Sequence, residues 1–471
     1  MHFLKEVPVR TAGSVLLVLL LAPAALSAHG TPDWARRYMV EYAARPSAAA
    51  TGRAIPSFSR QTNLGCNVCH TAFPMLTSFG RLFKLNAYTL TGLQTIGAGR
   101  EAAPSLKINL IPPVSTMVQT SFTQIAKAQP GTQNGNVEFP QELSVFFGEA
   151  ISPRLGTFIQ ITYDGGEGTV GIDNVSLRFA NHGKLASKEV IYGITLNNSP
   201  TVQDVWNTTP VWGFPFGSSD VAPAPAAAPM IAEGLAQKVG GLGAYALWNS
   251  HFYGEATVYR SAQQGGPHPP DATAEMTTKG VTPYWRFAYQ REWGRQYIEV
   301  GTYGLSSRLY PTGVTGLTDR FRDLAGDVQY ERVVGGGNFV VHATYIHERQ
   351  TLDATFGAGG SANPANTLNT IRADATLLTA SRVGASLGYF TTSGDADTLL
   401  YAPNSVTGSA TGKPNSSGLT AEAQFMPWLN TRFSLQYVAY QKFNGGTSDY
   451  DGLGRSASDN NTIYLLAWFM F

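Results

Sequence analysis

Residues 463–471, the last nine of the chain, have the sequence IYLLAWFMF and end on Phe471. Apolar side chains occupy every second position, as expected for a strand with an apolar face. At the end of a water-soluble protein, this segment would form an exposed edge strand prone to aggregation. As the closing strand of a barrel in a membrane, it would instead face lipid. The segment therefore predicts a transmembrane β-barrel.

The same segment resembles the C-terminal signal by which bacterial outer-membrane barrels are recognised for insertion. Period-two alternation, typical of strands, extends from it back to about Leu106. It is clearest at 284–290, 370–377, 421–425 and 431–443, where apolar side chains alternate with polar ones. The polar positions predict a wet or plugged lumen of mixed charge, lined by Arg286, Arg372, Asp374, Glu422 and Arg432.

The connections between the alternating stretches are short and long in turn. Short turns are predicted at 152–154, 181–183, 249–251, 292–294, 335–337, 380–381 and 427–428. Longer polar inserts fall near 198–228, 262–281, 305–319, 350–368, 393–415 and 443–459. This rhythm is typical of outer-membrane barrels, whose periplasmic turns are tight and whose outside loops are longer. Seven short turns between eight hairpins predict about sixteen strands, with both termini in the periplasm.

Composition agrees with an all-β membrane protein. Charged residues make up 14% of the chain, against about 25% in soluble globular proteins. The formal net charge is only +1, which argues against a nucleic-acid partner because such proteins carry a basic surface. Aromatic residues reach 11%, enough to furnish the interfacial belts of a membrane protein.

The N-terminus has the features of an export signal. Lys5 and Arg10 precede an apolar run at 15–21 that is too short to span a membrane, and small residues follow at 24–28. Cleavage after Ser27 or Ala28 would leave His29 near the new terminus. We therefore assign 1–28 to a signal peptide and expect the mature protein outside the cytoplasm, without a lipid anchor at the cleavage region.

The two cysteines of the chain lie in the stretch Cys66-Asn67-Val68-Cys69-His70. This spacing is the attachment pattern of c-type haem. Two thiols one helical turn apart can bond the two vinyl groups on one porphyrin edge, and the following histidine then lies under the iron. The motif predicts one covalently attached haem c, with His70 as the proximal iron ligand.

Other chemistry explains this motif less well. A disulfide or a thioredoxin-like pair would use the same cysteine spacing but would leave His70 unexplained. A structural zinc site would need four ligands, and no second Cys or His pair is nearby. We therefore expect a small α-helical haem domain at 29–104, plugging the lumen of a barrel at 105–471.

Helices are predicted at 33–42 and 73–88, the second with Leu76, Phe79, Leu82 and Phe83 as its apolar face. The cations that could pair with the haem propionates, or that could simply be solvated, are Arg60, Arg81 and Lys84. The distal ligand stays open among Met39, Met75, His29 or another residue.

The segment before the motif is Ala54-Ile55-Pro56-Ser57-Phe58-Ser59-Arg60-Gln61-Thr62. With the haem motif and the barrel, it resembles the fused outer-membrane cytochrome–porins of iron-oxidising bacteria. That family's pattern is Ala-x-Pro-x-Phe-Ala-Arg-Gln-Thr, from which Ser59 departs by one small residue. The motif match covers 54–70, and the barrel matches only in architecture and length. The resemblance implies a haem plug that takes electrons from Fe(II) outside and passes them to periplasmic carriers.

Three functions follow as hypotheses. The first is an outer-membrane electron conduit, an Fe(II):cytochrome c oxidoreductase whose partners are extracellular Fe(II) or another reductant and a periplasmic cytochrome c. The second is a solute porin whose haem domain is only a plug, and the third is a haem-based catalyst or ligand sensor. No acidic cluster marks an iron docking site, because the candidate loop carboxylates are dispersed: Asp204, Asp220, Asp271 and Glu275.

Overall fold

The computed structural model describes residues 56–62, 64–89, 113–206, 217–219, 221–262 and 270–471. The predicted signal peptide, the predicted helix at 33–42 and the expected start of the barrel at 105–112 lie outside these residues. Among the described residues, no helix is long and apolar enough to cross a membrane.

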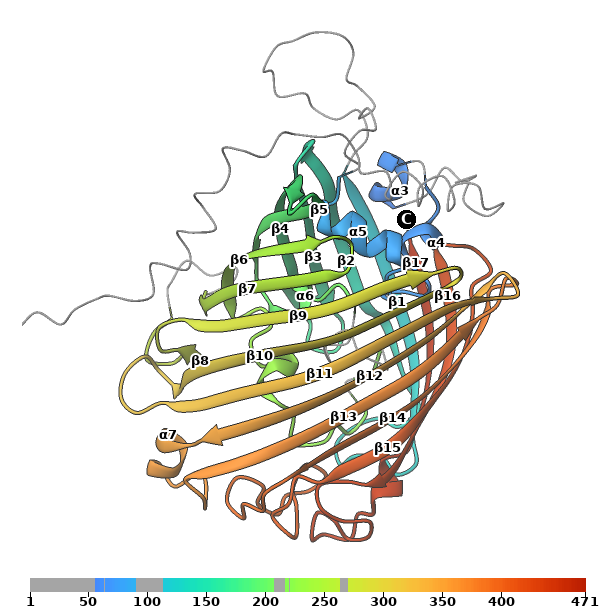
Figure 1. The fold of residues 1–471 in the computed structure, drawn as a ribbon. Helices are drawn as coiled ribbons and strands as arrows, with labels where there is room; N and C mark the ends of the chain where they lie inside the picture. Colours follow the sequence, from blue (N-terminus) through green and yellow to red (C-terminus); the bar gives the residue numbers. More distant parts are fainter. Residues whose placement is uncertain (1–55, 63, 90–112, 207–216, 220, 263–269) are drawn as a thin grey trace, which may run out of the picture.

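One antiparallel sheet closes on itself to form the barrel (Figure 1). The strands of its first half are β1 (Val114–Ile125), β2 (Asn136–Ser152), β3 (Leu155–Asp164), β4 (Thr169–Leu185), β5 (Lys188–Asn197), β6 (Val239–Trp248), β7 (Phe252–Ser261), β8 (Glu275–Thr278) and β9 (Thr282–Trp293). Those of the second half are β10 (Gln296–Thr312), β11 (Asp319–Val334), β12 (Gly337–Thr351), β13 (Ala365–Leu378), β14 (Val383–Gly394), β15 (Ser416–Phe425), β16 (Thr431–Lys442) and β17 (Thr462–Met470).

The barrel has sixteen strand positions, as predicted. Both β8 and β9 pair with β10, one after the other along its length, so the two short strands share one position. The circle closes where β1 pairs with β17 from Met117↔Met470 to Ile125↔Thr462. We call this junction of the first and last strands the seam.

Six of the seven predicted short turns are confirmed, and one is wrong. Residues 181–183 lie inside β4, which continues to Leu185 and pairs with β5 throughout. The turn falls at Ala186 and Ser187, both with positive φ (50° and 62°). Asn181-His182-Gly183 resembles a turn in sequence, but β4 extends through it, and His182 Nε2 lies 2.5 Å from Asn86 Oδ1 of the helical domain. The insert predicted from 305 also begins later, since β10 runs to Thr312.

Side chains alternate between the two faces of the wall as the sequence predicts. On β16, Phe433 and Leu435 point outward and are 40% and 49% exposed, while Arg432, next to Phe433 along the strand, is 6% exposed. Inside, Arg432 Nη2 binds Glu422 Oε1 at 2.5 Å and His342 Nδ1 lies 3.3 Å from Asp374 Oδ2. The charged residues of the predicted lumen therefore face inward and are largely paired.

The closing strand differs from expectation in one respect, because both of its faces are apolar. Ile463 and Leu465 point outward and are 41% and 43% exposed. Tyr464, Leu466 and Trp468 point inward and are buried in the barrel. The inner face is apolar because it packs, through Phe73, against the N-terminal helical domain.

The N-terminal domain sits inside one end of the barrel. Its helices are α3 (Ser57–Thr62), α4 (Cys66–Cys69) and α5 (Ser78–Leu85), and Figure 1 shows them together between β5 and β17. Ser57 Oγ donates to Gly148 O at 2.9 Å, Tyr245 Oη donates to Leu85 O at 2.7 Å, and Arg81 pairs with Glu331 at 2.5 Å. These wall residues all lie near short turns, so the domain fills the short-turn end of the lumen.

The predicted helix at 73–88 is shorter than expected. Thr77 caps α5 by accepting a hydrogen bond from Gly80 N at 3.1 Å, and residues 73–77 form a loop. The helix ends at Leu85, because Ala87 and Tyr88 have φ of 58° and 56°, which is incompatible with a right-handed helix.

The long connection between β5 and β6 also enters the lumen. It carries α6 (Pro200–Gln203) and a π-helix, η3 (Met230–Gly234). We call its described residues 217–238 the inner strap. Gln141 Nε2 on β2 donates to Ser218 O at 2.7 Å, whereas Ile231 N donates to Asp323 Oδ2 on β11 at 2.6 Å. The inner strap therefore crosses the barrel from the β2 wall to the β11 wall.

Candidate functional site

The Cys66–Cys69 segment forms a single helical turn, α4, that ends at His70. His70 N donates to Cys66 O at 2.9 Å. Residues three apart on a helix lie on the same side, so the turn presents both thiols together. Both cysteines are free thiols, and Cys66 is buried. The predicted motif residues are thus arranged as the attachment chemistry requires.

The loop after His70 folds back onto α4 and fixes the histidine. Thr77 N donates to Cys69 O at 2.9 Å, and Thr71 N donates to Met75 O at 3.1 Å. Helix α5 then crosses α4 so closely that a Cβ on Gly80 would lie 2.1 Å from Cys69 O. Only glycine fits at that position.

The histidine is buried and poor in polar partners. Burial lowers the pKa of His70 to about 4, against a smaller opposing effect of the backbone at Pro74 and Met75. Its Nδ1 is buried and lacks a hydrogen-bond partner of good geometry among the described residues. The imidazole is therefore neutral at ordinary pH, which is the form that binds a metal.

The two thiols are also held in an apolar environment. Burial raises the pKa of Cys66, and burial together with the neighbouring Cys66 raises the pKa of Cys69 to about 12. The thiol form is therefore favoured in the folded chain.

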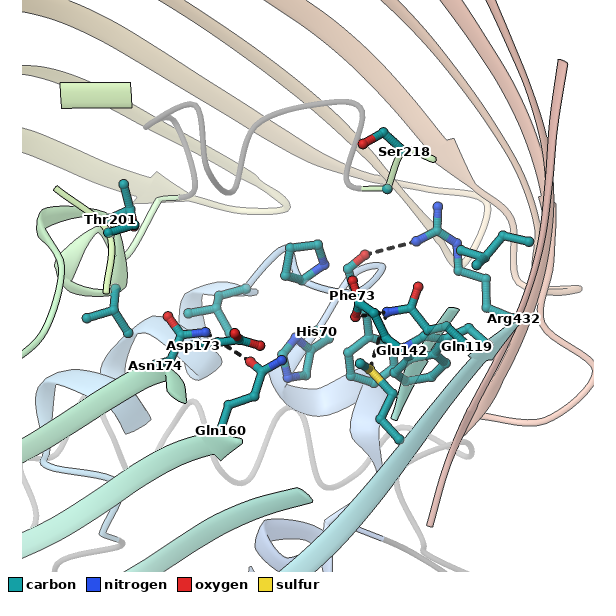
Figure 2. A pocket seen from close by; sticks show the side chains of 18 of the residues that line it. His70, Phe73, Gln119, Glu142, Gln160, Asp173, Asn174, Thr201, Ser218 and Arg432 are labelled. Carbon is teal, nitrogen blue, oxygen red and sulfur yellow. Dashed lines mark hydrogen bonds between the residues drawn. The ribbon is translucent and has the colours of Figure 1, made fainter. Parts of the chain in front are cut away.

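The three motif residues line one side of a chamber of about 1040 Å³ inside the barrel. Figure 2 shows His70, Phe73, Gln160 and Asn174 among the side chains that line this space. Aromatic side chains cover much of its surface near the motif: Phe58, Phe73, Phe83, Phe146, Phe158 and Trp468. The inner strap, including Ser218, lines another side, so the chamber lies between the helical domain and the strap.

These features fit a covalent haem. The site offers two free thiols, a neutral imidazole and an aromatic wall. Its volume is just above the roughly 300–1,000 Å³ of ordinary ligand pockets. Among the described residues, no group of three or more His, Cys, Asp or Glu side chains could hold a bare metal ion. Two thiols and one imidazole on an aromatic wall are the side chains that a covalently attached haem would use.

Of the three cations considered for the haem propionates, one lines the chamber. Arg81 instead pairs with Glu331 and lies over the Tyr297 ring at 4.1 Å, and Arg60 donates to Val114 O at 2.5 Å. Lys84 lines the chamber and donates to Asp204 O at 3.0 Å. Burial lowers its pKa to about 7, with a further lowering by Arg178.

Two lumen cations that the sequence did not connect with the motif also line the chamber, namely Arg372 and Arg432. Arg432 Nη1 donates to Phe73 O at 3.2 Å, three residues after the predicted iron ligand. Only the closure of the barrel brings residue 432 to residue 73, so no local sequence pattern could have linked them.

The candidates for the distal ligand differ in where the structure places them. His29 and Met39 lie outside the described residues. Met75 is 1% exposed and packs with Ala72 and Val340, and it is not part of the chamber lining. Two other methionines, Met117 and Met470, do line the chamber. The alternation along β1 and β17 could have predicted that both methionines face the lumen. Because both are far from the motif in sequence, nothing local linked them to it.

No protein-family model matches the chain, and neither does any curated protein. Among solved structures, the anion-selective porin from Comamonas acidovorans is similar at TM-score 0.45 and 11% identity, over 76% of this chain and 98% of that one. The outer membrane channel DcaP of Acinetobacter baumannii is similar at TM-score 0.44 and 12% identity, over 76% of this chain and 96% of that one. OmpT, an outer membrane protein of Vibrio cholerae, is similar at TM-score 0.43 and 11% identity, over 78% of this chain and 100% of that one. Similarity at this level says nothing about what the chain binds.

Proposed function

We propose that this chain is an outer-membrane Fe(II):cytochrome c oxidoreductase that holds one haem c on Cys66, Cys69 and His70. The observation that carries the proposal is the grouping of these three side chains on an aromatic chamber inside a closed barrel. A haem c supplies one-electron exchange, which matches the one-electron Fe(II)/Fe(III) couple. An insoluble or impermeant Fe(III) product is also a reason for oxidation to occur outside the cell.

The outer surface of the barrel supports a location in the membrane. Outward side chains along successive strands are large, apolar and exposed, among them Leu324, Tyr345, Ile371, Leu387, Leu419 and Leu435. Such a surface would be an aggregation hazard in water and is the expected lipid face of an outer-membrane barrel. From the same rule for loop lengths, we expect the short turns, and with them the helical domain, on the periplasmic side.

The orientation can be tested with epitope tags. A tag at Thr407, in the long connection between β14 and β15, should be labelled by antibody on intact cells. A tag at Gly336, in the short turn between β11 and β12, should be labelled only after the outer membrane is permeabilised. Labelling of Gly336 but not Thr407 on intact cells would show the reverse orientation and would place the motif outside.

The residues of the chamber have separate tasks in this proposal. Cys66 and Cys69 would hold the haem through two thioethers, and His70 would provide a nitrogen ligand to its iron. The aromatic wall would shield the group from water, and Lys84, Arg372 and Arg432 are the cations of the chamber lining that would lie nearest to its carboxylates. Haem potentials depend on axial ligands, hydrogen bonding and burial, so these surroundings set the driving force.

The contents of the lumen favour electron transfer over solute transport. The helical domain occupies the short-turn end, and the inner strap crosses the barrel between opposite walls. Both are tied to the wall by hydrogen bonds, which is unlike an open channel. The porin alternative requires a continuous water path past both obstacles.

The decisive experiment uses purified holoprotein in liposomes, with Fe(II) outside and cytochrome c trapped inside. We expect cytochrome c to be reduced, and we expect His70→Ala to lose this activity while the barrel still folds. His347→Ala is the matched control, because that imidazole contacts Asn369 on the wall and does not line the chamber. If Fe(II) leaves the wild-type haem oxidised while another external donor reduces it, the iron assignment is wrong. Steady ion conductance with no reduction by any donor would favour the porin.

A further inference from the structure

The seam of the barrel carries two methionines that face each other. Met117 on β1 and Met470 on β17 are directly opposite in the antiparallel register, so their side chains lie on the same face of the sheet. That face is the lumen, and both residues line the same chamber as Cys66, Cys69 and His70. Met117 is the more deeply placed of the two, with 5% of its surface exposed.

An aromatic contact joins this methionine pair to the motif. The Phe73 ring lies 4.5 Å from the His70 ring and 4.6 Å from the Trp468 ring, between ring centres. Phe73 and Met470 both pack against the buried cluster that contains Met117 and Trp468. Phe73 therefore connects the methionines to the predicted proximal histidine, although Met117 is separated from it by 47 residues and Met470 by 400.

The sulfur of Met117 also has a polar neighbour that simple packing does not require. Gln119 Nε2 lies 3.7 Å from Met117 Sδ and donates to Glu142 Oε2 at 2.7 Å, and Figure 2 shows Gln119 and Glu142 beside Phe73. A thioether is only a weak acceptor. Hydrogen bonds from a second layer of residues orient the ligands of metal sites and tune them, and Glu142–Gln119–Met117 has this form.

We propose that Met117 is the distal axial ligand of the haem, an inference that rests on the haem assignment made above. Among the described residues that line the chamber, the methionine and histidine side chains are His70, Met117 and Met470. Met117 is preferred over Met470 because it is buried and because Gln119 Nε2 approaches its sulfur to 3.7 Å. The site would then take one ligand from the helical domain and the other from the first barrel strand, so six-coordination requires the domain to be docked inside the closed barrel.

The ligand pair has a consequence for the redox potential. Met/His ligation raises the potential of a c-type haem relative to ligation by stronger nitrogen donors. A raised potential is what an acceptor of electrons from Fe(II) needs. Met117 would therefore help to set the potential that the proposed oxidation of Fe(II) requires.

The test is the optical and magnetic circular dichroism spectrum of the purified, full-length holoprotein in the ferric state. Wild-type protein should be six-coordinate and show the long-wavelength charge-transfer band of a thioether-ligated haem. Met117→Leu should lose this band, become five-coordinate and bind CO rapidly when reduced, while keeping covalent haem. Leucine is close to methionine in volume, so the barrel should tolerate it.

Further variants keep the test independent of folding and of iron oxidation. Met117→His should restore six-coordination without the band and lower the reduction potential. Met75→Leu and Met470→Leu should both keep the band. A wild-type protein without the band, or a Met117→Leu spectrum identical to wild type, overturns the proposal, as does loss of the band in Met470→Leu alone. Because none of these readouts uses Fe(II), a Met117-dependent band in a protein that Fe(II) cannot reduce would leave the ligand assigned and the iron function rejected.

Discussion

Replacing Cys66 and Cys69 together by alanine should abolish covalent haem while the barrel still assembles. Both thioethers depend on these two thiols. The chain has two cysteines in all, so no other thiol can replace them. The measurement is haem-dependent peroxidase staining after denaturing electrophoresis, with wild type retaining the stain. The loss should be complete in the double variant and partial in each single variant, because one thioether can still hold the group.

The barrel should survive this change, because α4 belongs to the plug and not to the wall. Folding is measured independently as the heat-modifiable mobility of the outer-membrane fraction. Ser59→Ala is the matched control, since its hydroxyl lies 3.8 Å from Cys66 Sγ and its removal leaves both thiols in place. Haem that stays bound to the double variant through denaturation would contradict the assignment of the motif.

Replacing Arg286 by methionine should produce the largest loss of barrel stability. Arg286 on β9 is fully buried in the lumen, where Nη2 binds Glu299 Oε1 at 3.1 Å and also pairs with Asp327 Oδ2. Nη1 lies 4.0 Å from Asp204 Oδ1, and the guanidinium stacks over Trp206 at 4.7 Å and Tyr303 at 5.0 Å. Removing one partner of a buried ion pair costs about 3–5 kcal/mol, because the remaining charges are left without compensation.

This loss should appear as unfolding of detergent-solubilised protein at lower urea concentration, with less folded protein in the membrane. Arg286→Lys keeps a positive charge, although lysine cannot reproduce the two-pronged guanidinium contact, and it should lie between methionine and wild type. Arg322→Met is the surface control, since Arg322 is an exposed residue of β11 outside this cluster. A methionine variant as stable as wild type would show that the carboxylates do not depend on Arg286 for compensation.

Much of the architecture could be predicted because strands leave a strong local pattern. The period of two is fixed by backbone geometry, so the alternation alone assigns Arg286, Glu422 and Arg432 to the lumen. Turn residues and the polar long inserts gave the strand count in the same way. The error at 181–183 arose because a turn-like tripeptide can remain in a strand when its neighbours pair on both sides.

The sequence by itself determined the motif Cys66–His70, the inward and outward phases of the strands and the closing segment, because each depends on residues adjacent or nearly adjacent in the chain. Only the tertiary structure decided which inward residues meet. The pairing of Met117 with Met470 depends on barrel closure, and the contact of Arg432 with Phe73 and of Arg81 with Glu331 depends on how the helical domain docks. Alternation along a strand predicts that a side chain faces the lumen. Which residues it contacts there depends on the register of the sixteen strands and on the packing of the helical domain, and these bring together residues hundreds of positions apart.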